Sequence, residues 1–188
     1  MIIRRTWAMP NAETFLIPPI SEMLAWRLRE CAVVIDPFAR NNRFGTITND
    51  LNPETSATHH LDAIEFLDRL IAEKVRADAV LFDPPYSPRQ ISEIYQNVGR
   101  GVTMKDTQMG PMYHAVRDLL ARLLKVNGIA VSCGWNSAGF GSGRLFDIEE
   151  ILLVAHGGMH NDTIVTVERK MQDDLFAGVF GEPELTPA

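Results

Sequence analysis

The sequence has little cysteine and no long apolar run. Its 188 residues include two cysteines, Cys31 and Cys133, which stand far apart without the spacing of a metal site. We therefore expect no disulfide framework and no bound metal, and two thiols that suit a reducing compartment such as the cytoplasm. No apolar stretch approaches the ~20 residues of a membrane-spanning helix, so no membrane partner is expected. Arg4 and Arg5 are not followed by the apolar core of a secretory signal.

The composition predicts one globular domain over residues 1–188. Hydrophobic residues make up 46% of the chain and charged residues 22%. The net charge of −6 argues weakly against a nucleic-acid partner. Basic residues nevertheless occur in segments after predicted strands, which a parallel sheet would bring to one edge: Arg40, Arg43, Arg89, Arg100, Lys105 and Arg144. They form either a nucleic-acid-binding rim or a set of scattered, solvated side chains.

The most informative stretch is an apolar run that ends in an acid, two prolines and a tyrosine. Residues 79–82 show no alternation, which predicts a strand buried on both faces, as in a parallel sheet. Pro84 and Pro85 end this strand because neither can donate a ladder hydrogen bond. Asp83 and Tyr86 are therefore expected at the carboxyl end of a central strand, where open α/β sheets bind ligands.

These four residues suit the transfer of a group to a planar amine. The lone pair of an exocyclic base amino group is delocalised into the ring, so the nitrogen is a poor nucleophile. Hydrogen bonds from its two N–H groups to the Asp83 carboxylate and the Pro84 carbonyl would favour a pyramidal nitrogen, and Tyr86 would stack on the base. The alternative is a strand that runs into a proline-rich turn with a surface tyrosine.

Asp83-Pro84-Pro85-Tyr86 resembles the catalytic motif of amino-methyltransferases that use S-adenosylmethionine, above all the DNA adenine-N6 enzymes. Residues 33–39, Val-Val-Ile-Asp-Pro-Phe-Ala, resemble the first cofactor motif of this family, and residues 49–53 resemble the second. The resemblance extends from about residue 14 to residue 170. It implies an α/β, Rossmann-like class I methyltransferase fold whose mostly parallel sheet ends in an antiparallel hairpin. It also implies methyl transfer to a base amino nitrogen, with adenine N6 in DNA favoured over cytosine N4 by the acid at position 83.

The same resemblance implies where the cofactor binds. Asp36 would lie near the ammonium group of its methionine moiety, Asp50 would accept both ribose hydroxyls, and Asp62 would accept from the adenine amino group. The full expected set is Phe15, Asp36, Pro37, Phe38, Asp50, Asn52 and Asp62. Ordinary roles remain open for three of these residues: Phe15 as a core residue, and Asn52 and Asp62 as helix caps.

The chain departs from the family pattern directly after Ala39. The family motif continues with Gly-x-Gly and a helix, whereas residues 40–45 read Arg-Asn-Asn-Arg-Phe-Gly. The next predicted strand begins at Thr46, and a parallel crossover normally needs a dozen or more residues. We therefore expect the first crossover helix to be reduced or missing, and cofactor binding to be weakened, rearranged or absent.

The remaining patterns complete the expected fold. An apolar pattern predicts a helix within residues 14–29, and Asn52-Pro53 predicts the start of a short helix. Residues 1–13 and 171–188 are expected to be loosely ordered. The other predicted helices cover residues 63–74 and 111–126, and the predicted strands cover 31–36, 46–50, 58–62, 129–133, 148–156 and 163–170, the last two as a hairpin.

The sequence leaves the substrate and the assembly open. Residues 87–108 predict a lid or recognition loop, because irregular segments of this length are usually functional or mobile. No separate target-recognition domain is expected, and a homodimer is one possible assembly. Two alternatives remain beside the DNA enzyme: methylation of guanine N2 in RNA, and a catalytically silent nucleic-acid-binding or partner subunit that kept the fold.

Overall fold

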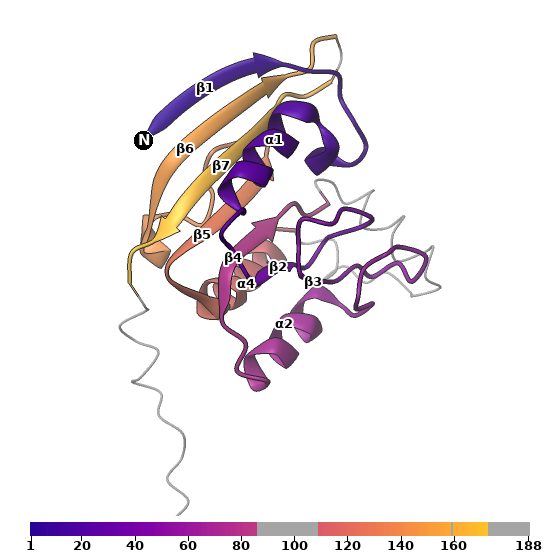
Figure 1. Ribbon diagram of the computed structural model, residues 1–188, viewed down its shortest axis with the longest axis vertical. Helices are drawn as coiled ribbons and strands as arrows, with labels where there is room; N and C mark the ends of the chain where they lie inside the picture. Colours follow the sequence, from indigo (N-terminus) through magenta and orange to yellow (C-terminus); the bar gives the residue numbers. More distant parts are fainter. Residues whose placement is uncertain (86–108, 159, 173–188) are drawn as a thin grey trace, which may run out of the picture.

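The computed structural model describes residues 1–85, 109–158 and 160–172, whose strands form one seven-stranded sheet (Figure 1). The strand order is β1-β6-β7-β5-β4-β2-β3. Every neighbouring pair is parallel except the pairs made by β7, which runs antiparallel to both β5 and β6. The strands are β1 (Ile2–Trp7), β2 (Val34–Asp36), β3 (Ile47–Thr48), β4 (Ala77–Phe82), β5 (Leu124–Gly134), β6 (Phe146–Ala155) and β7 (Thr163–Lys170).

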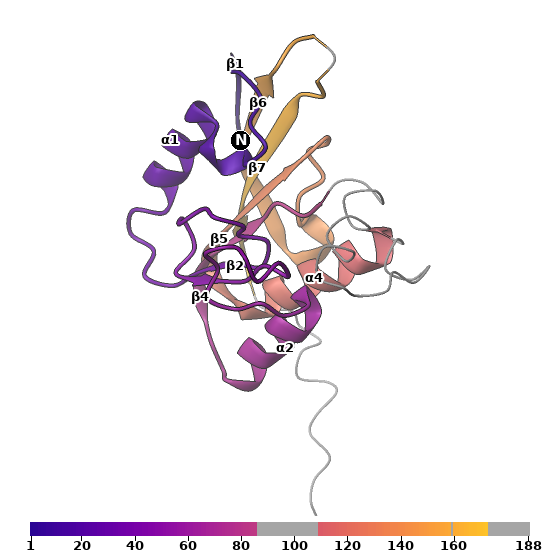
Figure 2. The same cartoon turned by 90° about the vertical axis from the view of Figure 1, so that its right-hand side faces the viewer.

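Helices cover the two faces of the sheet unequally. Helix α1 (Pro18–Arg27) lies on one face, and α2 (Ala63–Ala72) and α4 (Met109–Leu123) lie on the other (Figure 2). Two 3-10 turns, η1 (Thr14–Leu16) and η2 (Ser142–Arg144), complete the regular elements of the described ranges. Strand β4 separates the two cores: Ala79 and Leu81 join the α1 side, whereas Val80 and Phe82 join the α2–α4 side.

The predicted central strand and terminal hairpin are confirmed. Five of the six residues of β4 are buried, because the strand lies inside a sheet with helices on both faces. The last two strands of the described chain, β6 and β7, form an antiparallel pair. The first crossover is also as expected: only turns connect β2 to β3, because ten residues separate these two strands.

Several local expectations are wrong. Residues 58–62 do not form a strand; they contribute one isolated parallel bridge between His59 and Asn49. Residues 53–57 do not form the expected short helix. The Asn52 side chain instead accepts a hydrogen bond from the Glu54 amide at 3.0 Å, which closes a turn. The helix predicted over 111–126 begins at Met109 and ends at Leu123, because the chain pairs with β4 from Leu124 onward.

The N-terminus is a strand rather than a loose segment. Residues 2–7 pair with residues 150–155 of β6, so β1 is the outermost strand on one side of the sheet. Five of the six residues of β1 are exposed, so the strand has no buried face to give an alternating pattern. None of the helices in the described ranges is long and apolar enough to cross a membrane.

Candidate active site

The carboxyl ends of the parallel strands bring the expected acidic residues to one edge of the sheet. Asp36 is the last residue of β2, Asp50 follows β3, and Asp83 follows β4. Asp83 is half-buried. Burial raises the pKa values of Asp36, Tyr113 and Cys133, and the negative charge of Asp83 adds to each rise. The catalytic carboxylate expected from the sequence thus lies close enough to these three side chains to influence them electrostatically.

A small cavity of about 70 Å³ opens at this edge. It brings together three segments expected to bind the cofactor and one proline of the catalytic motif. Its walls are largely apolar, with a carboxylate from each of two segments. The lining residues are Pro37, Phe38, Asn49, Asp50, Leu51, Leu61, Asp62, Ala63, Ile64, Pro85 and Met112.

The two carboxylates in the cavity wall also hold the backbone. Asp50 accepts hydrogen bonds from the amides of Arg40 at 3.0 Å and Asn52 at 2.9 Å. Asp62 accepts from the amide of Ile64 at 3.0 Å and caps α2, as the alternative reading of this residue anticipated. A carboxylate has about four lone-pair positions, so Asp50, which accepts two of these bonds, can accept from a ligand as well.

Asn49 joins the segments that form the cavity, a role that the sequence did not reveal. Its side chain is 1% exposed and donates to the carbonyls of Pro37 at 3.2 Å and Leu61 at 3.0 Å. It also accepts from the amide of Leu61 at 2.9 Å. In the sequence, Asn49 falls inside the predicted strand over 46–50, and its hydrogen-bond partners lie 12 residues away on either side. Met112, on α4, was missed because no local pattern connects it to this edge.

Asp36 stabilises the shortened loop rather than lining the cavity. Its side chain is fully buried and accepts from the Asn42 side-chain amide at 2.9 Å and from the Phe38 amide at 3.0 Å. Asn42 donates a second hydrogen bond to the Ala39 carbonyl at 2.7 Å. Burial outweighs these hydrogen bonds and raises the pKa of Asp36 to about 7.

Arg40 occupies the position of the first glycine in the cofactor motif that the sequence resembles. Its backbone has a φ of 50°, the left-handed conformation that glycine adopts without strain. The turn therefore keeps a glycine-like backbone although the side chain has changed. Asn41 and Asn42, whose residue type tolerates positive φ, do not adopt it.

The other expected cofactor residues lie away from this cavity. Phe15 is 2% exposed and packs edge-to-face on Phe44 in the α1-side core, with ring centroids 6.4 Å apart. Asn52 lies in the turn after Asp50 and is not among the residues that line the cavity. Tyr86, the last residue of the catalytic motif, lies outside the described residues.

Three of the six residues of the expected basic rim lie in the described ranges. Arg40 and Arg43 are exposed on the loop after β2, at the edge that carries Asp83. Arg144 pairs with Asp118 of α4 at 2.6 Å and lies just before β6, because the segment after β5 returns towards the opposite edge. Arg89, Arg100 and Lys105 lie outside the described residues. Within residues 1–85, 109–158 and 160–172, no cluster of His, Cys, Asp and Glu could hold a metal ion.

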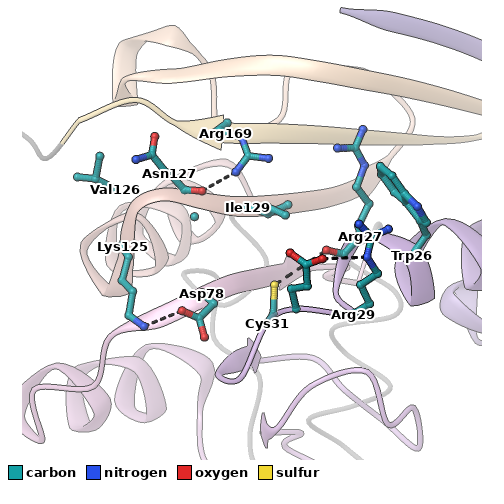
Figure 3. A pocket seen from close by; sticks show the side chains of 12 residues that line it. Trp26, Arg27, Arg29, Cys31, Asp78, Lys125, Val126, Asn127, Ile129 and Arg169 are labelled. Carbon is teal, nitrogen blue, oxygen red and sulfur yellow. Dashed lines mark hydrogen bonds and ion pairs between the residues drawn. The ribbon is translucent and has the colours of Figure 1, made fainter.

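A larger cavity of about 320 Å³ lies at the opposite edge of the sheet (Figure 3). Its basic side chains are engaged in polar contacts: Lys125 pairs with Asp78 at 2.6 Å, and Arg169 donates to the Asn127 carbonyl at 2.6 Å. Trp26 forms part of the wall. These contacts indicate a structural ion-pair network at the end of the sheet away from Asp83.

No protein-family model matches the chain, and no curated protein matches it in sequence. Solved structures match its fold. NSun6 from Pyrococcus horikoshii with SFG has a TM-score of 0.54 and 16% identity, over 81% of this chain and 52% of its own. The N-methyltransferase NodS from Bradyrhizobium japonicum has a TM-score of 0.51 and 9% identity, over 81% and 94% of the two chains.

A putative S-adenosylmethionine-dependent methyltransferase from Streptococcus mutans has a TM-score of 0.52 and 13% identity, over 78% of this chain and 46% of its own. This chain thus spans about half the length of NSun6 and of the Streptococcus mutans protein. Identities this low establish the fold alone. The chain has the class I methyltransferase fold, a mostly parallel sheet that includes an antiparallel hairpin of β6 and β7.

Proposed function

We propose that this protein transfers a methyl group from S-adenosylmethionine to an exocyclic amino nitrogen of a nucleic-acid base, with adenine N6 in DNA as the expected acceptor. One observation carries the proposal: Pro85 of the Asp-Pro-Pro-Tyr motif lines the same cavity as Asp50 and Asp62. The motif that suits amine activation therefore adjoins the two carboxylates that suit a nucleoside.

The walls of the cavity fit the chemistry of the cofactor. Phe38 and Ile64 offer apolar surface for an adenine ring, Asp50 offers acceptors for ribose hydroxyls, and Asp62 offers one for the adenine amino group. The cavity of about 70 Å³ is smaller than the roughly 300–1,000 Å³ of typical small-molecule sites. Binding must therefore widen it.

The chemistry proposed for this edge centres on Asp83. When bound, S-adenosylmethionine supplies a methyl group attached to a positively charged sulfur. The Asp83 carboxylate accepts one N–H of the acceptor amine, and the Pro84 carbonyl accepts the other. The methyl carbon would bond to this nitrogen as its bond to sulfur breaks, S-adenosylhomocysteine would leave, and the nitrogen would pass a proton to Asp83 or to water. Tyr86 provides the face on which the base stacks.

Calorimetry with S-adenosylmethionine and S-adenosylhomocysteine tests whether the cavity binds the cofactor. Asp50→Ala should weaken binding roughly 10- to 100-fold, because hydrogen bonds to a charged acceptor are lost. Asp68→Ala is the matched control, since Asp68 is exposed on α2 outside the cavity. No heat with either compound would contradict the proposal.

A second function, a silent subunit that binds nucleic acid or a partner, is favoured by the replaced glycines and the small cavity. It predicts a folded protein that binds a nucleic acid or protein but neither S-adenosylmethionine nor S-adenosylhomocysteine. The same calorimetry therefore separates the two functions. Guanine N2 in RNA remains the alternative acceptor if the cofactor binds, and a comparison of DNA and RNA substrates distinguishes it.

A further inference from the structure

All three tryptophans of the chain are mainly exposed, which is unusual for the largest apolar side chain. The exposed fractions are 61% for Trp7, 57% for Trp26 and 56% for Trp135. Trp26 lies on α1 and borders the cavity at the far edge of the sheet. Trp7 and Trp135 instead end β1 and follow β5, so both lie at the edge that carries Asp83.

The strand register places Trp7 and Trp135 at nearly the same height on the sheet. Gly134 of β5 is opposite Ile164 of β7, Ile164 is opposite Leu153 of β6, and Leu153 is opposite Arg5 of β1. Trp135 directly follows Gly134, and Trp7 comes two residues after Arg5. Three strand spacings of about 4.8 Å separate the strands that carry them, or roughly 14 Å.

Trp135 is also next to the catalytic strand. Phe82 of β4 is opposite Ser132 of β5, so Asp83-Pro84-Pro85 and Trp135 leave the sheet from neighbouring strands. A line drawn from Asp83 through Trp135 to Trp7 therefore crosses four strand spacings, roughly 19 Å along the edge. Two exposed aromatic side chains mark this line.

Arg5 adds an unpaired positive charge to the same line. Residues two apart on a strand point to the same face, so Arg5 and Trp7 share one face of β1. The Arg5 side chain is exposed and makes no hydrogen bond or ion pair with any residue in the described ranges. Arg4, its neighbour, is held by Glu150 on the other face.

We propose that Arg5, Trp7 and Trp135 form a contact line for a single-stranded stretch of nucleic acid beside the acceptor base. Tryptophan faces stack on bases of any sequence, and an unpaired arginine contacts the phosphate backbone. This inference rests on the proposed function for its choice of partner. It also explains how an acidic chain with no separate recognition domain among its described residues could hold a nucleic acid.

Intrinsic fluorescence measures this binding without any catalysis. The Asp83→Asn protein is titrated with single-stranded DNA and RNA oligonucleotides in the absence of S-adenosylmethionine. Trp7→Ala and Trp135→Ala should each weaken binding by about 5- to 150-fold, the effect of losing one stacked base. Val126→Ala, at an exposed apolar side chain in the wall of the opposite-edge cavity, is the control and should bind like the parent. Trp7→Phe should restore much of the lost affinity, because a smaller aromatic ring still stacks.

The salt dependence of the same titration tests Arg5. Arg5→Gln should reduce the slope of log affinity against log salt by roughly 0.7, the value of one phosphate contact with a single strand. Arg122→Gln is the matched control, since Arg122 is exposed in the last turn of α4. Melting temperatures confirm that each variant is folded.

Parent-like affinity of folded Trp7→Ala and Trp135→Ala would overturn the contact line, whether or not methyl transfer occurs. Self-association of the protein that is lost in Trp7→Ala would also overturn it, in favour of an interface between two copies. If the cofactor does not bind but the tryptophan variants lose oligonucleotide affinity, the proposed methyl transfer fails and the contact line stands.

Discussion

At the scale of single residues, the site depends on two buried polar side chains, Asp36 and Asn49. Each is surrounded by hydrogen-bond donors or acceptors from the loops it holds. Buried polar groups are costly unless they are paired, and the loss of one partner leaves the others unsatisfied. Substitution of either residue should therefore cost more unfolding free energy than its position in the sequence suggests.

Asp36 should make stability depend on pH. Its folded pKa of about 7 lies above the unfolded value of about 3.9. Between these values the folded state binds the extra proton, so the stability that Asp36 contributes is present below about pH 4 and lost as the pH rises to 7. Relative to Asp36→Asn, the wild-type free energy of unfolding should fall by up to about 1.4 kcal/mol per pH unit.

Urea denaturation of both proteins between pH 4.5 and 7.5 measures this difference. The comparison with the variant removes the contributions of carboxylates that both proteins share. Parallel stability curves over this range would show that Asp36 is not protonated in the folded protein.

Asn49→Ala should destabilise the fold and weaken cofactor binding together. The substitution leaves the Pro37 and Leu61 carbonyls without their side-chain donor, and we expect a loss of about 1–3 kcal/mol of unfolding free energy. Asn52→Ala, in the partly exposed turn nearby, should cost less. Thermal unfolding with and without S-adenosylmethionine measures both effects, and equal losses for the two variants would contradict this role of Asn49.

At the scale of elements, the distinctive feature is the turn that replaces the first crossover helix. Asp36, Asn42 and Asn49 connect this turn to β2 and β3 through side-chain hydrogen bonds. A helix N-terminus would offer a ligand several free amides, whereas here the Phe38, Ala39 and Arg40 amides already donate within the protein. We therefore expect the turn to shape the cavity rather than to bind the charged end of the cofactor.

Arg40→Gly should stabilise the turn. A non-glycine residue in the left-handed region costs roughly 1–2 kcal/mol, which glycine avoids. Part of this gain is offset because glycine loses more backbone entropy on folding and because the Arg40 side chain no longer contacts the Ala12 carbonyl. The melting temperature should rise by a few degrees. A lower melting temperature would show that the side-chain contact outweighs the backbone strain.

The sequence predicted elements whose pattern is local and missed those defined by distant partners. The apolar run before Asp83, the amphipathic pattern of α2 and the hairpin of β6 and β7 each carry their own signal. Strand β1 does not, because most of its residues are exposed and its partner strand lies about 150 residues away.

The same difference between local patterns and distant partners decides which site residues could be predicted from the sequence. Asp50, Asp62 and Pro85 follow or precede recognisable elements, and the structure brings all three to one cavity. The motif resemblance did not reveal that Asp36 would be enclosed by Asn42, because that contact exists only after the glycines are replaced. Phe15 lies in the core because η1 directs it against Phe44.

At the scale of the whole molecule, the edge formed by the carboxyl ends of the parallel strands differs from the opposite edge in its cavities and exposed side chains. One edge carries Asp83, the small cavity and two exposed tryptophans, whereas the other carries a cavity whose charges pair with one another. A net charge of −6 repels nucleic acid at long range. Binding should therefore be weak, dominated by contacts near the acceptor base, and readily tested with short substrates.

The most direct test is transfer of labelled methyl from S-adenosylmethionine to methylation-free DNA, with RNA beside it and Asp83→Asn as the matched variant. We expect label in DNA as N6-methyladenine, and its loss in the variant while cofactor binding remains. Label in RNA alone would contradict the DNA acceptor but keep the reaction. No label in either nucleic acid from folded, cofactor-saturated protein would contradict the proposed methyl transfer.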